Sequence, residues 1–229
     1  MKTSAIIVAA GSGRRLGHDL PKAFVTLGGH PMLYYPLRAL AAVKDVSEAV
    51  IALPAGTQSA ARSLIESTGL DIPVKLTPGG AERQDSVRIA LELVSAESDV
   101  VIVHDAARPF ATADLFAACI RAAYAAGAAI AAIAVTDTLK QVDENAIVAT
   151  ARRAGLYRAQ TPQAFRRELL VRAHREAVRN EIAATDDAEL VERLGERVEI
   201  VEGSPLNFKI TTSDDLALAQ ALIAASPHP

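Results

Sequence analysis

Segments typical of buried strands alternate with segments typical of helices, and this alternation constrains the fold more than any other feature. Apolar runs rich in β-branched residues or alanine occur at residues 4–10, 49–53, 74–77, 100–104 and 128–135. Segments with apolar residues at helical spacing stand between them, at residues 32–42, 57–68, 84–94 and 113–126. Alternation of this kind predicts a mostly parallel sheet covered by helices on both faces. We therefore expect an α/β fold, a Rossmann-like three-layer sandwich.

The alternation is interrupted between residues 136 and 160, where the sequence becomes polar. A long structureless loop inside a compact domain is uncommon and usually functional. We therefore predict a projecting β-hairpin arm, with its turn near residues 143–145, that grips a second subunit. Helices at residues 166–179, 186–194 and 213–224 and a strand at 198–201 are expected to complete a single domain spanning residues 1–229.

The first strand runs directly into a glycine-rich loop, in which Gly11 and Gly13 precede Arg14 and Arg15, and Lys22 follows shortly after. Glycines leave backbone N–H groups open to a ligand, and clustered cations repel one another unless an anion neutralises them. The loop therefore predicts a phosphate site, although glycines alone could serve only to shape a turn. The G-x-G-x-x-x-G spacing differs from the dinucleotide fingerprint, and no P-loop motif is present.

Polar and small residues also follow the other expected strands, and ligands of open parallel sheets lie at the carboxyl ends of the strands. Gly79 and Gly80 would allow a nucleobase to approach the backbone, or would simply form a turn, and Ser86 offers a hydroxyl group. Asp105 follows a fully apolar strand, so its carboxylate needs a partner. That partner could be Mg²⁺, a substrate hydroxyl or a salt bridge to Arg108.

Composition excludes several other classes of protein. The formal net charge of −3 disfavours a general nucleic-acid surface. The single cysteine, Cys119, cannot form an internal disulfide, which fits a reducing cytoplasm. The longest apolar stretch, residues 122–135, is too short for a membrane span, and no signal peptide is evident. No G-x-S-x-G elbow or metal-binding histidine spacing is present. We expect a cytoplasmic protein that binds neither nucleic acid nor membrane.

A series of motifs then resembles the 2-C-methyl-D-erythritol 4-phosphate cytidylyltransferase family. The motifs occur in order from Ser4 to the last expected helix: A-A-G-S-G-R-R-L-G with P-K, G-G-A-E-R-Q-D-S-V, H-D-A-A-R-P, T-D-T-L-K, T-P-Q-A-F, T-D-D-A and N-F-K-I-T. The resemblance implies a nucleotidyltransferase that transfers CMP from CTP to methylerythritol phosphate and releases pyrophosphate. It further implies a step of the non-mevalonate isoprenoid pathway, with Mg²⁺ or another divalent cation as cofactor.

The resemblance also implies roles for individual residues. The catalytic set is Arg15, Lys22, Arg153 and Lys209. The nucleotide-binding set is Ala9, Ala10, Gly11, Ser12, Gly13, Gly79, Gly80 and Ser86. The substrate-binding set is Asp105, Arg108, Thr138 and Thr161, with Asp105 also a candidate metal ligand. The resemblance also implies a homodimer with exchanged arms, in which Thr138 and Arg153 would act in the partner's site. The adjacent Arg152 could take the role of Arg153.

The chemistry needs no general base, because the second pKa of a phosphate monoester is about 6 and the group is largely dianionic near neutral pH. The obstacle is repulsion between two anions, which cations and loop N–H groups would offset. A ribitol-5-phosphate cytidylyltransferase is the nearest alternative. A non-catalytic nucleotide-sensing or scaffold protein is a second, and a Rossmann oxidoreductase is a distant third that the loop spacing disfavours.

Overall fold

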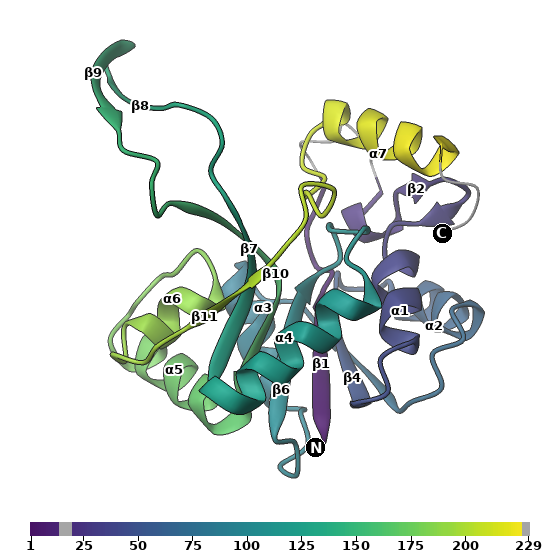
Figure 1. The fold of residues 1–229 in the computed structure, drawn as a ribbon. Coiled ribbons are helices and arrows are strands. Elements are labelled where there is room, and N and C mark those ends of the chain that lie inside the picture. The colour runs from purple at the N-terminus through teal and green to yellow at the C-terminus, as the bar shows by residue number, and fades with distance from the viewer. Residues whose placement is uncertain (14–19, 226–229) are drawn as a thin grey trace.

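A seven-stranded sheet forms the centre of the protein in a computed structural model that describes residues 1–13 and 20–225 (Figure 1). Its strand order is β11-β7-β10-β6-β1-β4-β5. Four of the six strand pairings are parallel, and the two pairings of β10 are antiparallel. The mostly parallel sheet is thereby confirmed. The strands are β1 (Thr3–Val8), β4 (Val46–Leu53), β5 (Val74–Pro78), β6 (Val100–Asp105), β7 (Ala128–Ala134), β10 (Tyr157–Arg166) and β11 (Glu199–Glu202).

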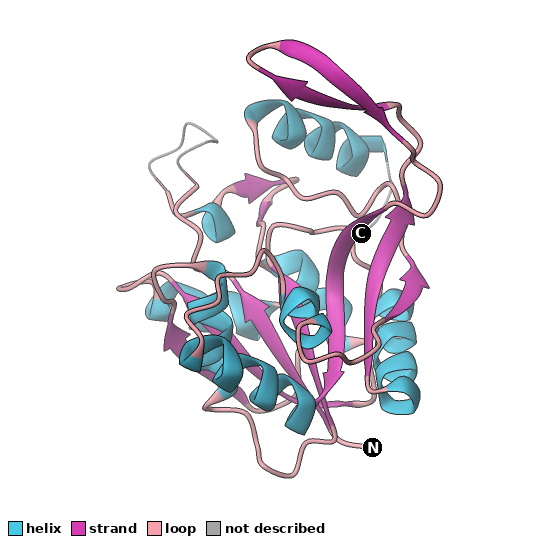
Figure 2. Ribbon diagram, turned by 90° about the vertical axis from the view of Figure 1, so that its left-hand side faces the viewer, coloured by secondary structure: helices cyan, strands magenta, loops and turns pink. Residues whose placement is uncertain are grey.

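Helices cover both faces of this sheet and complete the expected three layers (Figure 2). Side chains of a strand alternate between faces, so Ile6 packs against the helices of one face while Ala5 and Ile7 pack against those of the other. The first face carries α3 (Arg83–Leu91), α5 (Arg167–Arg179) and α6 (Asp187–Glu192). The second carries α1 (Tyr34–Ala41), α2 (Gln58–Ser67) and α4 (Ala113–Ala126).

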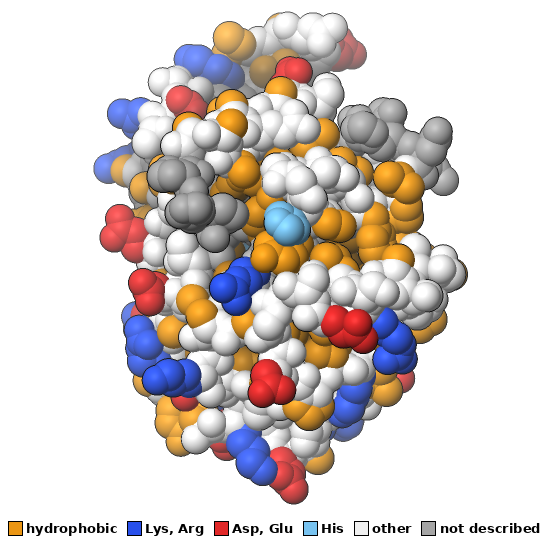
Figure 3. All heavy atoms as spheres, turned by 90° about the vertical axis from the view of Figure 1, so that its right-hand side faces the viewer, with side chains coloured by type: hydrophobic (Ala, Val, Ile, Leu, Met, Phe, Trp, Pro, Cys, Tyr) orange, Lys and Arg blue, Asp and Glu red, His pale blue; other side chains and the backbone are white. Residues whose placement is uncertain are grey.

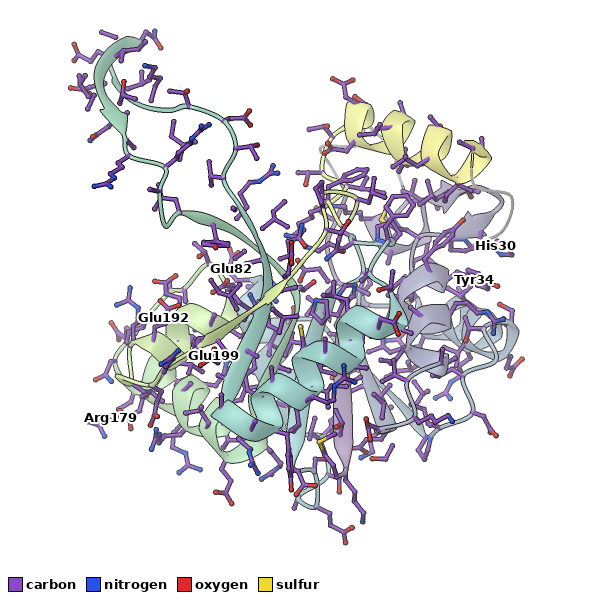
Figure 4. All side chains as sticks on the ribbon, viewed as in Figure 1. His30, Tyr34, Glu82, Arg179, Glu192 and Glu199 are labelled. Atoms are coloured by element: carbon purple, nitrogen blue, oxygen red, sulfur yellow. The ribbon has the colours of Figure 1, made fainter. Side chains whose placement is uncertain are left out.

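A smaller cluster lies beyond the carboxyl ends of the central strands. It joins α7 (Ser213–Ala225) to the short strand β2 (Thr26–Leu27), and to Met32 directly after β3 (His30–Pro31), through buried apolar side chains. The His30 ring stacks on Tyr34 at 4.1 Å between centroids (Figure 4). Apolar side chains gather in the upper half of the face that lies on the right in Figure 1 (Figure 3). Within the described part of the chain, every helix is too short or too polar to cross a membrane.

The predicted arm is a two-stranded antiparallel hairpin that projects from the body (Figure 1). It consists of β8 (Leu139–Asp143) and β9 (Ala146–Ala151), and all residues of both strands are exposed. The turn residues Glu144 and Asn145 both have positive φ, at 42° and 65°. Two such residues fit a tight hairpin turn whose twist matches that of the strands.

The central strand β10, residues 157–166, was not predicted: residues 157–160 were expected to belong to the arm, and residue 166 to begin a helix. Pro162 explains the error, because proline has no N–H to donate and usually argues against a central strand. The pairing of β10 with β7 is interrupted between Ala159 and Gln163, so Pro162 falls where no ladder hydrogen bond is needed. The 3₁₀ helix η2 (Lys22–Phe24), β2 and β3 were also not predicted.

Candidate active site

A cleft of about 710 Å³ lies at the carboxyl ends of the central strands. From β1 the chain continues through α1 to β4 on one side, and from β5 it returns through α3 to β6 on the other side of β1. The strand order therefore reverses between β1 and β6, which is where open α/β sheets bind ligands. The lining comprises residues 8–13, 22–23, 80–83 and 105–107, with Ser86, Lys209 and Thr211.

The glycine-rich loop forms one wall of the cleft, and Ala9, Ala10, Gly11, Ser12 and Gly13 all line it. A side chain added at Gly11 would meet nothing within 4 Å, so the backbone there faces open space. The half-buried Lys22 lies beside the loop because its backbone N–H donates to the Gly11 carbonyl at 3.2 Å. Arg15, the other predicted cation of the loop, lies outside the described residues.

The second glycine motif packs tightly at the start of α3. A Cβ at Gly79 would lie 2.1 Å from the Ala10 Cβ, so Gly79 permits contact between the two loops. The Gly80 N–H donates to the Ser86 hydroxyl at 3.0 Å, and that hydroxyl donates to the Glu82 carbonyl at 3.1 Å. Gly80 and Ser86 line the cleft, whereas Gly79 supports the wall from behind. Glu82 caps α3 and is labelled in Figure 4.

Asp105, at the end of β6, lies opposite Val8 in the sheet and is only 6% exposed. Its Oδ1 accepts from Arg83 Nε at 2.9 Å, and its Oδ2 lies 2.7 Å from Lys209 Nζ. Burial opposes ionisation, but Arg83 and Lys209 outweigh it and hold the pKa of Asp105 well below its usual range. The ion pairs of Asp105 are thus with these two cations and not with Arg108.

Arg83 is a residue of the cleft to which sequence reasoning assigned no role. It is the first residue of α3, and its Nη1 also donates to Asp187 Oδ2 at 2.7 Å. A cation at a helix N-terminus is unfavourable, because the helix dipole is positive there. That unfavourable position is the sequence signal that could have indicated acidic partners for Arg83.

Thr161 and Arg108 lie behind the cleft and hold its wall in place. The Thr161 hydroxyl accepts from the Asp105 N–H at 3.0 Å and contacts His104 Nδ1 at 3.0 Å. Arg108 donates to the carbonyl oxygens of Asn207 at 2.7 Å and Ala159 at 3.2 Å. These contacts join β6, β10 and the segment that carries Lys209.

Thr138, Arg152 and Arg153 flank the two strands of the arm, which projects from the body (Figure 1), and none of the three lines the cleft. All three are exposed. The Arg153 guanidinium donates to the Thr136 carbonyl, within the base of the arm. The structure therefore brings together the loop, Lys22, Asp105 and Lys209, and it does not bring Thr138 or Arg153 to them within one chain.

The side chains that line the cleft do not form a metal-binding site of their own. Both carboxylate oxygens of Asp105 already face cations. Among residues 1–13 and 20–225, no three His, Cys, Asp or Glu side chains are grouped to hold a metal ion. A divalent cation bound by protein alone usually takes several oxygen ligands, so these residues do not fit a metal that is retained without nucleotide.

Comparison with known proteins gives one consistent result. The sequence profile of the family described as 2-C-methyl-D-erythritol 4-phosphate cytidylyltransferase matches residues 3–225. A protein of that name from Salinibacter ruber is 46% identical over 219 residues, covering 96% of this chain and 92% of the relative. Another, from Deinococcus radiodurans, is 45% identical over 221 residues, covering 96% and 89%.

Solved structures agree with the sequence relatives. The crystal structure of 2-C-methyl-D-erythritol 4-phosphate cytidylyltransferase from Thermus thermophilus has a TM-score of 0.82 and 38% identity, covering 98% of this chain and all of that one. The 4-diphosphocytidyl-2C-methyl-D-erythritol synthase of Anaerococcus prevotii has a TM-score of 0.85 and 31% identity, covering 97% and 98%. With its switch-point cleft and its motifs matched along nearly its whole length, the chain belongs to the 2-C-methyl-D-erythritol 4-phosphate cytidylyltransferase family.

Proposed function

We propose that the chain carries out the reaction for which its family is named, transfer of CMP from CTP to 2-C-methyl-D-erythritol 4-phosphate with release of pyrophosphate. The observation that supports the cleft as the place of reaction is its combination of a bare glycine loop with Lys22 on one side and the Asp105–Lys209 pair on the other. A triphosphate fits the first feature, and a polyol phosphate fits the second.

In the proposed reaction, an oxygen of the methylerythritol phosphate attacks the α-phosphorus of CTP. The new P–O bond forms as the bond between the α-phosphorus and the bridging oxygen to the β-phosphate breaks, and pyrophosphate leaves with that electron pair. No proton has to be removed, since the attacking phosphate is largely dianionic above its second pKa of about 6. Lys22 and Arg15 stabilise the charge at the α-phosphoryl group, and Lys209 orients the attacking phosphate.

Mg²⁺ is proposed as part of the nucleotide substrate. Because the oxygens of Asp105 are shared between Arg83 and Lys209, the triphosphate would supply the main ligands of the ion. Mg²⁺ prefers phosphate oxygens and water with few protein carboxylates. When bound, it neutralises charge on the phosphates. Removal of free divalent ions should therefore abolish turnover without changing the melting temperature of the ligand-free protein.

A homodimer with exchanged arms is proposed to complete the site. A lone two-stranded hairpin is at best marginally stable in water, and the arm exposes Val142, Ile147 and Val148 by 56%, 64% and 56%. Exposed apolar residues on a projecting hairpin fit burial against a second copy of the chain. Thr138 and Arg153 would then reach the cleft of the partner, with Arg152 the alternative to Arg153.

The deciding experiment incubates the protein with CTP, Mg²⁺ and either methylerythritol phosphate or ribitol 5-phosphate, and measures pyrophosphate. Turnover with methylerythritol phosphate is expected, and turnover only with ribitol 5-phosphate would overturn the assignment. The names of the relatives do not favour the ribitol-5-phosphate alternative. CTP binding without turnover on either compound would instead support a nucleotide sensor. Lys22→Ala should lower kcat by about 10²–10³-fold, the effect of one well-placed donor.

The lone buried thiol of Cys119 is consistent with the cytoplasm as the site of action.

A further inference from the structure

A continuous row of hydrogen bonds and ion pairs links helices α5 and α6 to the cleft. His174 Nε2 on α5 lies 3.0 Å from Asp187 Oδ1, and Asp187 Oδ2 accepts from Arg83 at 2.7 Å. Arg83 then contacts Asp105, which contacts Lys209. His174 and Asp187 are 3% and 1% exposed, and neither lines the cleft. The T-D-D-A motif, which carries Asp187, has no other role in the proposed reaction.

The two halves of this motif do different things. Asp186 caps α6 by accepting from the Glu189 N–H at 2.9 Å, which is an ordinary helix start. Asp187 points inward, and its backbone N–H donates to Gln163 Oε1 at 3.2 Å, so its position is set by β10. The carboxylate of Asp187 is held ionised in the interior: burial opposes ionisation, but Arg83 and His174 lower its pKa. Helix capping alone does not require a buried charge.

Charge balance explains what the buried carboxylate does. Arg83 divides its guanidinium between two acids, giving Nε to Asp105 and Nη1 to Asp187. Only one oxygen of Asp105 is thereby taken, and the other remains for Lys209. An arginine with a single acidic partner tends to engage both of its oxygens in a bidentate pair. Without the charge of Asp187, Arg83 would therefore compete with Lys209 for Asp105.

We propose that Asp187, oriented by His174, is a positioning residue that keeps Arg83 from displacing Lys209 on Asp105. This inference rests on the proposed role of Lys209 in binding the substrate phosphate. Asp187→Asn should raise KM for methylerythritol phosphate about tenfold, in the usual range for residues that act through a network, and leave KM for CTP within a factor of about two. Val191→Ala, a buried α6 substitution outside the row, controls for loss of stability alone.

The test compares steady-state kinetics and melting temperatures of Asp187→Asn, Val191→Ala and Lys209→Ala. Equal effects of Asp187→Asn and Val191→Ala on both KM values would overturn the proposal, as would an unchanged KM for the sugar phosphate in Asp187→Asn. If Lys209→Ala keeps normal kinetics, the proposed role of Lys209 fails first. If Lys209→Ala is impaired but Asp187→Asn is not, only the inference about Asp187 fails.

His174 provides an independent readout. His174→Gln keeps an N–H donor for Asp187 and should retain most of the wild-type KM for methylerythritol phosphate, whereas His174→Ala should raise it in the same direction as Asp187→Asn. The double variant Asp187→Asn with His174→Ala should be no worse than Asp187→Asn alone, since both changes act on one contact. Additive losses in the double variant would contradict a shared route through Arg83.

Discussion

Lys209 Nζ lies 2.7 Å from Asp105 Oδ2. The contact joins a lysine side chain that is 41% exposed to an aspartate side chain that is 8% exposed. The lysine reaches this position because the Ile210 N–H donates to the Ala107 carbonyl at 2.9 Å and so docks the late segment beside β6. An ammonium group has three donors, so one can face Asp105 while another meets a phosphate oxygen. The buried carboxylate of Asp105 thereby orients the exposed ammonium group of Lys209 toward the cleft.

Lys209→Ala tests that relationship directly. We expect kcat/KM for methylerythritol phosphate to fall by about 10²-fold, because a charged, oriented donor to the attacking phosphate is lost. Steady-state pyrophosphate release measures the effect. Lys44→Ala is the matched control, since Lys44 is exposed just before β4 and lies at the opposite edge of the sheet. Equal activity of the two variants would remove Lys209 from the site.

The variants Lys22→Ala and Arg153→Ala should each be nearly inactive alone. Activity should return when the two variant chains are mixed and form dimers with each other. If one site uses Lys22 of one subunit and Arg153 of the other, each mixed dimer contains one intact site and one doubly damaged site. Random pairing then gives about a quarter of wild-type activity. The measurement is pyrophosphate release after the two chains are co-refolded. Activity that stays at the level of the separate variants would contradict arm exchange, and Arg152→Ala in place of Arg153→Ala distinguishes the neighbouring arginines.

The convergence of the motifs could be predicted from the sequence, because parallel strands place their carboxyl ends at one edge. Val8 and Asp105 lie opposite each other in neighbouring strands, so the residues that follow each of them must meet. The sequence did not reveal which distant cation pairs with Asp105. Reasoning from proximity suggested Arg108, three positions away, but that guanidinium donates to two backbone carbonyls instead.

The sequence also did not reveal β10. This strand was hidden by Pro162 and by the polar side chains of Gln160 and Gln163, which do not form an apolar run. Its polar residues have a structural use, since Gln163 contacts both Asp186 and Asp187. Contacts of this kind join elements far apart in the chain, and no local periodicity encodes them.

Stability should depend on pH through His104, which is fully buried between Thr161 and the Arg108 carbonyl. Burial lowers the pKa of His104 to about 4, from 6.5 in an exposed histidine. The unfolded chain therefore binds an additional proton between these values, and the stability present above pH 6.5 is lost as pH falls toward 4. The slope approaches about 1.4 kcal/mol per pH unit for one proton. Urea unfolding between about pH 4.5 and 7, a range that covers most of the interval between the two pKa values, measures it.

His104→Gln should flatten this slope, whatever it does to absolute stability, because the substituted side chain does not titrate. His30→Gln serves as the control, since His30 is exposed and its ring stacks on Tyr34. An unchanged slope in His104→Gln would assign the pH dependence to other groups.

Cys119 should be unreactive in the native protein. It is fully buried on the inner face of α4, and burial raises the pKa of its thiol to about 12. The thiolate is the reactive form, so a disulfide reagent such as dithionitrobenzoate should label the folded chain very slowly and the urea-unfolded chain rapidly. Because the chain contains one cysteine, absorbance reports that site alone. Rapid labelling under native conditions would contradict the buried position.

Alanine at the two glycines that flank the cleft should separate packing from ligand binding. A methyl group at Gly79 would lie 2.1 Å from the Ala10 Cβ and 3.0 Å from the Ser86 hydroxyl, so Gly79→Ala should lose about 1–3 kcal/mol of stability through overpacking. Gly11→Ala meets nothing within 4 Å, and its melting temperature should be unchanged. Its methyl group nevertheless enters the space beside the exposed loop backbone, where triphosphate oxygens would approach. Gly11→Ala should therefore weaken CTP binding in calorimetry while folding normally, and CTP affinity equal to wild type would mean that the nucleotide phosphates bind elsewhere in the cleft.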